Sequence, residues 1–226
     1  MPIFRMSENM IFPPVRMADE SGLLAFGGNL NVDSLLSAYS LGIFPWFSDD
    51  QPILWWSPDP RLVLYFKNFR VSKSLNKLIK KEIFHVTMDT AFKEVIYECA
   101  SLDYRKDDGT WIVPQMIDAY CRLHQVGYAH SVEAWHNGQL VGGLYGVSLG
   151  KSFFGESMFT RKSNASKVAF VYLVRFLEKE GFDFIDCQVS TEHLISFGAC
   201  EVERTLFLKQ LDKSLKTPSK KGRWFL

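Results

Sequence analysis

The chain has 226 residues, of which 47% are hydrophobic, 23% charged and 15% aromatic, and its formal net charge is +1. This composition is typical of a soluble globular protein, and it excludes a disordered, collagen-like or disulfide-dense chain. The longest apolar run, at 168–174, is far shorter than the roughly 18–20 residues that cross a bilayer. No signal peptide is visible and the four cysteines lack metal-finger spacing, so we expect a cytoplasmic protein with reduced thiols and no membrane association.

Residues 1–61 are predicted to form a small N-terminal domain that docks on the rest of the chain. Asp33 is expected to cap a short helix that ends at Gly42. An aromatic segment follows, in which prolines that forbid a helix are interleaved with Phe44, Trp46, Phe47, Trp55 and Trp56. Two interpretations are equally good: a small aromatic core between two domains, or a wall on which a flat ring stacks.

Residues 62–226 are predicted to form a second domain of mixed helices and strands. In chain order we expect a strand over 61–66, a helix over 72–79 capped by Ser72, a helix capped by Thr90, and a helix that Pro114 opens and Gly127 closes. Strands over 130–135, 140–147 and 152–159 follow, then a helix over 165–178, a strand over 182–189, a short last strand over 206–211 and a partly solvated basic tail. Asn137-Gly138 predicts a hairpin between the first two of these strands.

The order hairpin, long strand, helix, strand is typical of the acetyltransferase (GNAT) fold. The fold class is therefore predicted to be α+β, with the small N-terminal domain packed on a GNAT-like C-terminal domain. In that fold a glycine-containing loop before the central helix holds the pyrophosphate of coenzyme A. Here Asn164 and Ser166 stand where small glycines would be, so the scaffold is kept and the coenzyme A cradle is lost.

Three polar residues stand in apolar surroundings. Asp186 and Gln188 are two apart in a predicted strand and should share one face, with Cys187 on the other. Glu156 lies among phenylalanines and Met158. Any one of them alone is best explained as a hydrogen-bonded group that joins strands, but the three together favour a functional site.

A basic run follows the aromatic segment. Its lysines recur at helical spacing and share one face: Lys73, Lys77, Lys80 and Lys81. Such a run is usually a solvated helix face, and the more specific interpretation is a patch that follows the phosphates of a nucleic acid. The five histidines show no metal-ligand spacing, so no metal site is expected.

Taken together, the chain resembles the leucyl/phenylalanyl-tRNA–protein transferases over nearly its whole length. The resemblance rests on GLLAFGGNL at 22–30, GIFPWF at 42–47, PILWWSPDPR at 52–61, GTWI at 109–112, GESMF at 155–159, NASK at 164–167, DCQ at 186–188 and FGACE at 197–201. It implies an N-degron enzyme that moves Leu or Phe, with Met as a further candidate donor, from aminoacyl-tRNA to proteins that begin with Arg or Lys.

The resemblance also implies roles for individual residues. The family's adenosine-stacking and pocket tryptophans correspond to Trp46 and Trp111, its catalytic pair to Asp186 and Gln188, and its acidic substrate-binding residue to Glu156. Pocket-lining positions correspond to Leu144, Phe153, Met158, Phe170, Leu173 and Ile185. Leu173 replaces an aromatic residue, which leaves the preference between Leu-tRNA and Phe-tRNA donors open.

The chemistry of such a transfer needs no ATP, metal or other cofactor, because an aminoacyl ester is already activated. Placement of the attacking amine and charge stabilisation remain as tasks for the protein. We expect Gln188 to orient the amine, and Asp186 to fix Gln188 and stabilise positive charge on the attacking nitrogen. An acyl-coenzyme A N-acyltransferase of the same fold and a non-catalytic RNA-binding module are the alternatives. A monomer is expected.

Overall fold

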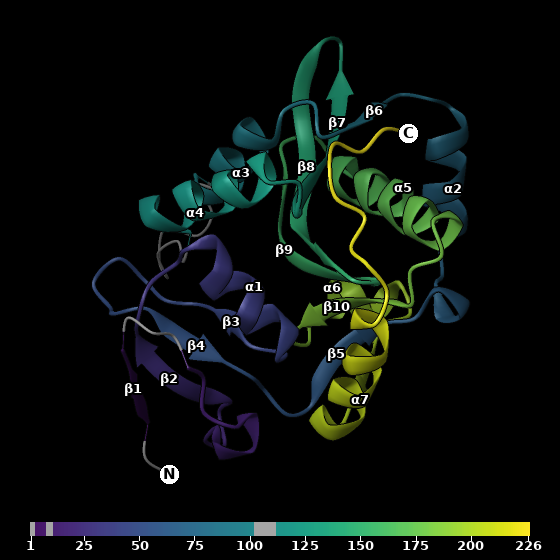
Figure 1. Cartoon of the computed structure of the whole chain (residues 1–226). Helices are drawn as coiled ribbons and strands as arrows, with labels where there is room; N and C mark the ends of the chain where they lie inside the picture. Colours follow the sequence, from purple (N-terminus) through teal and green to yellow (C-terminus); the bar gives the residue numbers. More distant parts are fainter. Residues whose placement is uncertain (1–2, 8–10, 102–111) are drawn as a thin grey trace.

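A computed structural model describes residues 3–7, 11–101 and 112–226, and it shows a mixed α+β protein with two sheets (Figure 1). The first sheet has the strand order β1-β2-β4-β3 and the second the order β11-β5-β10-β9-β8-β7-β6. The α+β prediction is therefore confirmed.

The smaller sheet is built from short strands near the N-terminus: β1 (Phe4–Met6), β2 (Leu23–Gly27), β3 (Phe44–Pro45) and β4 (Leu54–Trp56). Helix α1 (Val32–Ser40) connects β2 to β3, and a short 3-10 helix covers Val15–Met17. Gly42 adopts a φ of +72°, and a Cβ there would lie 2.7 Å from Leu208, so the end of α1 needs a glycine as predicted.

The larger sheet contains β5 (Arg61–Leu64), β6 (His85–Met88), β7 (Ala129–His136), β8 (Gln139–Leu149), β9 (Ser152–Thr160), β10 (Phe184–Gln188) and β11 (Cys200–Val202). Neighbouring strands pair antiparallel, except that β9 and β10 pair in parallel and are joined through α5 (Ala165–Lys179). The predicted order of hairpin, long strand, helix and strand is therefore present. Asn137 and Gly138 both have positive φ, as a tight hairpin turn requires.

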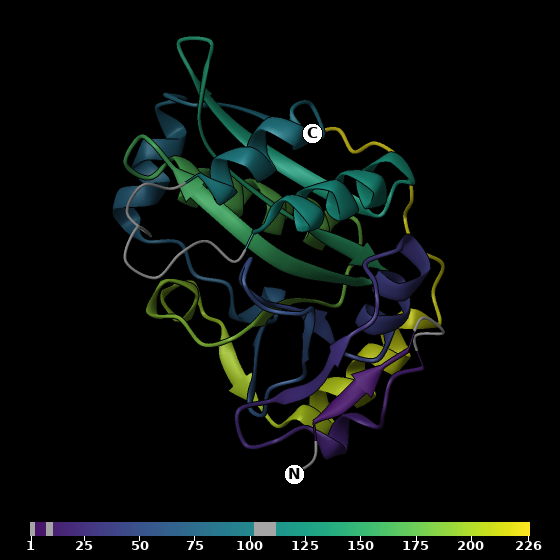
Figure 2. The same cartoon turned by 90° about the vertical axis from the view of Figure 1, so that its left-hand side faces the viewer.

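Helices cover both faces of the larger sheet (Figures 1 and 2). One face packs against α3 (Phe92–Ala100) and α4 (Pro114–Gln125). The other face packs against α5, with α2 (Lys73–Lys80) beside that helix, and a 3-10 helix at Phe66–Asn68 leads into α2. Ser72 accepts a hydrogen bond from the Leu75 N–H, which confirms the predicted cap.

Two predicted helix caps are wrong. Asn31, not Asp33, is the N-cap of α1, and Asp33 lies in the first turn, where its charge is favourable. Ala91, not Thr90, is the N-cap of α3. The Thr90 hydroxyl donates to the Met88 carbonyl and the Thr90 N–H donates to Glu133, so the hydroxyl does not cap the helix.

The predicted last strand over 206–211 is also wrong, because this segment lies inside helix α7 (Arg204–Leu215), which follows the short helix α6 (Glu192–Ser196) and β11. Phe207 and Leu211 are four residues apart and both buried, while Leu206 is exposed. That burial has the period of a helix, but the crowding of apolar residues at 206–208 hides it in the sequence.

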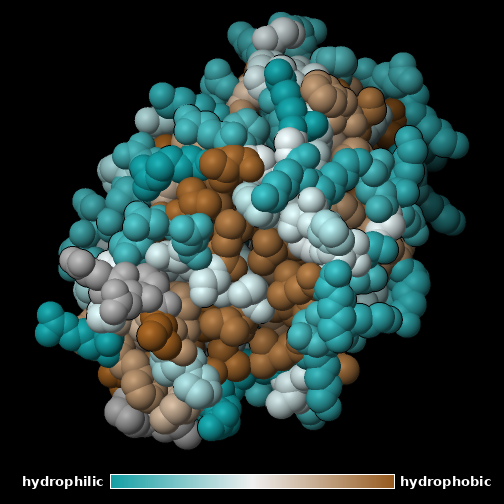
Figure 3. All heavy atoms as spheres, in the orientation of Figure 1, coloured by the Kyte–Doolittle hydropathy of each residue, from teal (hydrophilic) through white to brown (hydrophobic). Residues whose placement is uncertain are grey.

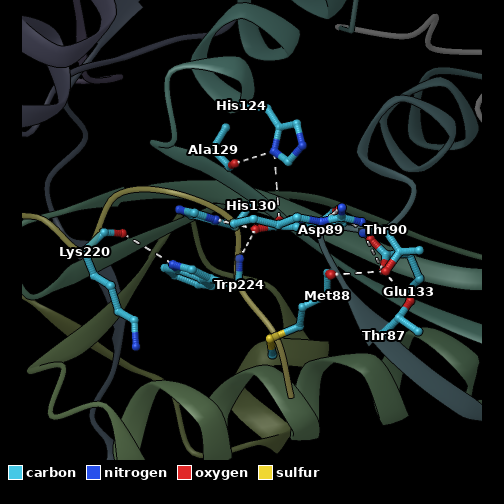
Figure 4. A network of polar contacts seen from close by, with 12 residues as sticks. Thr87, Met88, Asp89, Thr90, His124, Ala129, His130, Glu133, Lys220 and Trp224 are labelled. Atoms are coloured by element: carbon cyan, nitrogen blue, oxygen red, sulfur yellow. Dashed lines mark hydrogen bonds and ion pairs between the residues drawn. The ribbon is translucent and has the colours of Figure 1, made fainter.

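The basic tail is anchored at its end. Trp224 is buried, its indole stacks on the His130 ring at a centroid distance of 3.6 Å, and its backbone N–H donates to Asp89 Oδ2 (Figure 4). The His130 ring nitrogen Nδ1 lies 2.8 Å from the same oxygen. Lys220, Lys221 and Arg223 are exposed whereas Trp224 is buried, so the tail is only partly solvated.

The change from one sheet to the other falls between β4 and β5, close to residue 61. A single hydrophobic cluster nevertheless joins Leu24 and Trp55 of the smaller sheet to Phe154 and Phe159 of the larger one. Trp55 is thus part of a core between the two sheets. The division into domains 1–61 and 62–226 stays a prediction about which parts fold as units.

Candidate functional site

A cavity of about 300 Å³ opens where β9 and β10 separate. The parallel pairing of these strands ends at Phe154 and Asp186, and the residues beyond this pair line the cavity on both sides. The N-terminal segment contributes Phe44, Pro45 and Trp46 to its wall. In the space-filling view, apolar side chains gather around a hollow in the middle of this face (Figure 3). A cavity of this size and polarity suits a small organic group.

All six apolar residues predicted to line a substrate pocket do line this cavity: Leu144, Phe153, Met158, Phe170, Leu173 and Ile185. They come from β8, β9, α5 and β10, and five of them are nearly fully buried. Because β9 and β10 pair Phe153 with Ile185, the two side chains face α5 together. The apolar part of the cavity is therefore built from the larger sheet and its central helix.

Glu156 and Gln188 lie side by side in the cavity wall, which Ser157, Thr191 and His193 also line with polar groups. Gln188 Nε2 donates a hydrogen bond of 2.8 Å to Glu156 Oε1. Two buried phenols contact the same carboxyl group: Tyr39 Oη lies 2.8 Å from Oε1, and Tyr120 Oη lies 2.9 Å from Oε2. Burial raises the pKa of Glu156 from 4.5 to about 7, against the hydrogen bonds from the tyrosines and Gln188, which lower it.

Asp186 lies behind this wall and does not line the cavity. Its carboxylate is fully buried and accepts two hydrogen bonds from Arg61, from Nε at 2.8 Å and from Nη2 at 2.7 Å. It also accepts the backbone N–H of Gln188 at 2.9 Å. Arg61 is itself buried, and its guanidinium lies between the rings of Phe44 and Phe207. The ion pair thus joins β5, β10, α7 and the aromatic segment.

The predicted alternation along β10 does not hold beyond Asp186. The pairing with β5 is irregular between Asp186 and Gln188, and Gln188 has a φ of +62°, a conformation that an L-residue rarely adopts. As a result, Cys187 and Gln188 both line the cavity, although the sequence pattern puts them on opposite faces. Burial also raises the pKa of the Cys187 thiol, which keeps it protonated and unreactive.

Trp46 lies at the cavity with 41% of its surface exposed, and its ring packs against Trp56 at a centroid distance of 5.7 Å. The Trp56 indole N–H donates to the Trp46 carbonyl, which fixes the segment locally. Trp46 is therefore partly exposed at the cavity, which is compatible with the stacking interpretation. Trp111 lies outside the described residues.

The four lysines of the basic run lie on or directly after α2, are all exposed and do not line the cavity: Lys73, Lys77, Lys80 and Lys81. Among the described residues no carboxylate forms an ion pair with them. They make a positively charged surface that is separate from the cavity.

The sequence did not identify four residues as part of the site: Tyr39, Tyr120, Arg61 and His193. The carboxyl groups that the first three contact are between 36 and 125 residues away along the chain, and no local pattern shows them. His193, for which the sequence indicates no role beyond the lack of metal-ligand spacing, lines the cavity with a buried Nε2 that has no hydrogen-bond partner among the described residues. Burial lowers the pKa of His193. Within 3–7, 11–101 and 112–226, no three His, Cys, Asp or Glu side chains are placed to hold a metal ion, and no helix could cross a membrane.

Comparison with family models gives two matches that together span most of the chain. Residues 63–212 match the family described as leucyl/phenylalanyl-tRNA protein transferase, and residues 28–59 match the model for that family's N-terminal domain.

Individual proteins match over nearly their full length. A leucyl/phenylalanyl-tRNA–protein transferase of Syntrophobacter fumaroxidans is 57% identical over 95% of this chain and 92% of its own. One from Desulfatibacillum aliphaticivorans is 55% identical over 100% of this chain and 97% of its own. Among solved structures, L-PGS from Bacillus licheniformis aligns with 88% of this chain and 66% of its own, at 12% identity and a TM-score of 0.41.

Proposed function

Because this chain belongs to the leucyl/phenylalanyl-tRNA protein transferase family, a family of aminoacyltransferases, we propose that it moves leucine or phenylalanine from an aminoacyl-tRNA to a protein whose first residue is arginine or lysine. The observation that supports this function most is the cavity, whose apolar interior ends at the amide of Gln188 and the carboxyl of Glu156. An apolar amino acid side chain fits the interior, and its ester carbonyl would then lie near the polar wall.

The donor side chain would be held by the apolar wall of the cavity. The interior is lined mainly by aliphatic, aromatic and thioether groups, and within the part of the chain that the structure describes Glu156 and His193 are the only Asp, Glu, Lys, Arg or His residues in its wall. Leu173 lies on the α5 side of this wall. A leucine here leaves more room than an aromatic residue would, which suits the larger phenylalanine as well as leucine.

The adenosine at the end of the donor tRNA would stack on Trp46, which lines the cavity and is partly exposed. Base stacking on an aromatic side chain contributes about 1–3 kcal/mol and tolerates any base. The body of the tRNA would contact the lysines of α2, because they are exposed, share one face and lack acidic partners among the described residues.

Gln188 would orient the attacking amine. Its amide N–H is already donated to Glu156, so its amide oxygen is the end of the group left to accept a hydrogen bond from the amine. The amine nitrogen then bonds to the ester carbon, the bond from that carbon to the ribose oxygen breaks, the nitrogen loses a proton and the ribose oxygen gains one. The ester supplies the driving force, so no ATP or metal enters this scheme.

Asp186 would act as a positioning residue. Its carboxylate is behind the cavity wall and accepts the Gln188 N–H, so it holds the backbone that carries the amide. We propose that any stabilisation of positive charge on the attacking nitrogen by Asp186 acts across Gln188 and without contact. The buried Arg61 fixes the carboxylate from the other side.

The test is incubation of the protein with radiolabelled Phe-tRNA and a peptide that begins with arginine, followed by detection of labelled peptide. A matched peptide that begins with alanine is the control for the acceptor, and Gln188→Ala is the control for the site. Label in the arginine peptide alone supports the proposal. Tight binding of coenzyme A without aminoacyl transfer would favour an acyl-coenzyme A N-acyltransferase, and tRNA binding without a new peptide bond would favour an RNA-binding module.

A cytoplasmic monomer stays a prediction. Size-exclusion chromatography with light scattering tests the oligomeric state, and a mass near 26.0 kDa is expected.

A further inference from the structure

Three polar side chains meet behind the amide of Gln188. Tyr39 comes from α1, Tyr120 from α4 and Glu156 from β9, and all three are buried. The two tyrosines do not line the cavity, so their hydroxyl groups do not contact a bound substrate directly. Burying three such groups costs free energy unless each finds a partner, and here they are partners of one another.

The oxygen atoms of these groups make three short contacts. Tyr39 Oη lies 2.5 Å from Tyr120 Oη, Tyr39 Oη lies 2.8 Å from Glu156 Oε1, and Tyr120 Oη lies 2.9 Å from Glu156 Oε2. Each group therefore touches the other two, and the contacts close a ring. Each contact is short enough to need a proton between its two oxygens.

Counting protons decides the ionisation state of the ring. The two phenols bring one proton each, which is enough for two of the three contacts. If Glu156 were ionised, the two phenol protons would serve two contacts and the third pair of oxygens would face each other with no proton between them. That pair is the two phenol oxygens at 2.5 Å if both phenols donate to Glu156, or a phenol oxygen and a carboxylate oxygen at 2.8 or 2.9 Å if one phenol donates to the other. With a third proton on Glu156 Oε2, each group donates once and accepts once: Glu156 to Tyr120, Tyr120 to Tyr39, and Tyr39 to Glu156 Oε1.

We propose that Tyr39, Tyr120 and a protonated Glu156 form a closed ring of hydrogen bonds that positions Gln188 for the transfer. The ring leaves Glu156 Oε1 as the carbonyl-like oxygen, and this is the atom that accepts the Gln188 Nε2–H. Ring and amide together settle which end of the amide is presented to the cavity. The positioning role rests on the proposed function. The protonation of Glu156 does not, because it follows from the contacts within the ring.

The surroundings of the ring agree with the proton count. Burial, with a smaller contribution from the negative charge of Asp186 on β10, raises the pKa of Glu156 to about 7. That charge is paired with Arg61 on β5, and Tyr145 on β8 packs edge-on against Tyr120. Burial also raises the pKa of Tyr39 and of Tyr120 well above 10, so both phenols keep their protons.

The first experiment removes single hydroxyl groups with Tyr39→Phe, Tyr120→Phe and the double variant, and measures kcat and donor KM with Phe-tRNA and an arginine peptide. Each single change should lower kcat by roughly 5- to 10-fold with donor KM little changed, the effect of one lost hydrogen bond. Because the first change already opens the ring, the double variant should lose much less than the product of the two single losses. Tyr65→Phe is the matched control. The Tyr65 hydroxyl donates a hydrogen bond of 2.6 Å to Gln210, and neither residue lines the cavity.

The second experiment is infrared difference spectroscopy of the full-length protein at pH 6. The wild type should show the carbonyl stretch of a protonated carboxyl that is missing in Glu156→Gln and shifted in Tyr120→Phe, because Tyr120 accepts the Glu156 proton in the ring.

Three results would overturn the proposal. Absence of the infrared band at pH 6 means that Glu156 is ionised and the ring does not exist. Single losses that multiply in the double variant mean two independent hydrogen bonds. A lower melting temperature with unchanged kcat in both single variants means that the tyrosines only stabilise the fold. If the wild type shows no aminoacyl transfer, the proposed function fails, and the infrared band still decides whether the ring exists.

Discussion

The buried ion pair between Arg61 and Asp186 makes Asp186→Asn a test of stability as well as of turnover. The carboxylate accepts one hydrogen bond from Arg61 Nε at 2.8 Å and one from Nη2 at 2.7 Å, and neither side chain is more than 1% exposed. Asparagine keeps an oxygen for the Gln188 N–H but leaves the cation buried without a counter-charge. Removing one member of such a pair costs about 3–5 kcal/mol.

That cost is a large part of a typical unfolding free energy of about 5–15 kcal/mol. Low activity of Asp186→Asn could therefore reflect unfolded protein alone. Arg61→Met with Asp186→Asn removes the unpaired cation and keeps an apolar side chain between Phe44 and Phe207, so the double variant should be more stable than Asp186→Asn by about 2 kcal/mol or more.

Urea unfolding at pH 7 measures these differences, with equal m values as the check that the unfolding transition is comparable. The single-turnover rate per folded molecule should fall far more than donor binding in Asp186→Asn and in the double variant, by roughly 100- to 1,000-fold. If the stability losses of Arg61→Met and Asp186→Asn add up to the loss of the double variant, the two side chains are not coupled. A near-normal rate in the stable double variant would limit Asp186 to a role in folding.

Three further outcomes are expected. Burial raises the pKa of Glu156 from 4.5 to about 7, so the stability that protonated Glu156 contributes is full below pH 4.5 and is lost as the pH rises to 7. Relative to Glu156→Gln, the wild type's free energy of unfolding in urea should therefore fall by ~3 kcal/mol across that window, and parallel pH curves of the two proteins would contradict this. Trp46→Ala should weaken donor use by about 1–3 kcal/mol without unfolding the protein, and unchanged kinetics with aminoacyl-adenosine would argue against stacking. The basic run consists of Lys73, Lys77, Lys80 and Lys81. Neutralising one of these lysines should lower the log–log salt slope of tRNA binding by roughly 0.7–0.9 and leave the use of aminoacyl-adenosine as donor unchanged. An unaltered slope after all four changes would mean that the run is only a solvated helix face.

The apolar part of the site could be predicted because it follows patterns along the chain. Leu173 and Phe170 lie on the buried face of a regular helix, and Phe153 and Ile185 lie on the inward side of regular strands. Alternation and helical period place such side chains without knowledge of their partners. The resemblance to a known family then assigned these positions to one pocket, and the structure brings them together.

The polar part could be predicted only as a list of residues. Alternation puts Asp186 and Gln188 on one face, but the irregular pairing and the positive φ of Gln188 give the two side chains different partners. Such a departure depends on how β5 and β9 meet β10, which a local pattern does not contain. The same reason explains the wrong last strand, because the burial of Phe207 against Phe184 and Arg61 decides that 204–215 is a helix.

The placement of Tyr39, Phe44 and Arg61 bears on what the N-terminal segment contributes. Tyr39 holds the carboxyl group that holds Gln188, and Phe44 both lines the cavity and covers the guanidinium that pairs with Asp186. Glu156 is thus held directly by a side chain from the first 61 residues, and Gln188 is held indirectly, through Glu156 and through the carboxylate that Arg61 fixes. A change in how this segment packs would move the amide of Gln188 even though no residue of β10 had changed. The aromatic segment was expected to be either a core or a binding wall. Trp55 is buried in the core, whereas Trp46 lines the cavity and is partly exposed, so a binding role stays a prediction for Trp46.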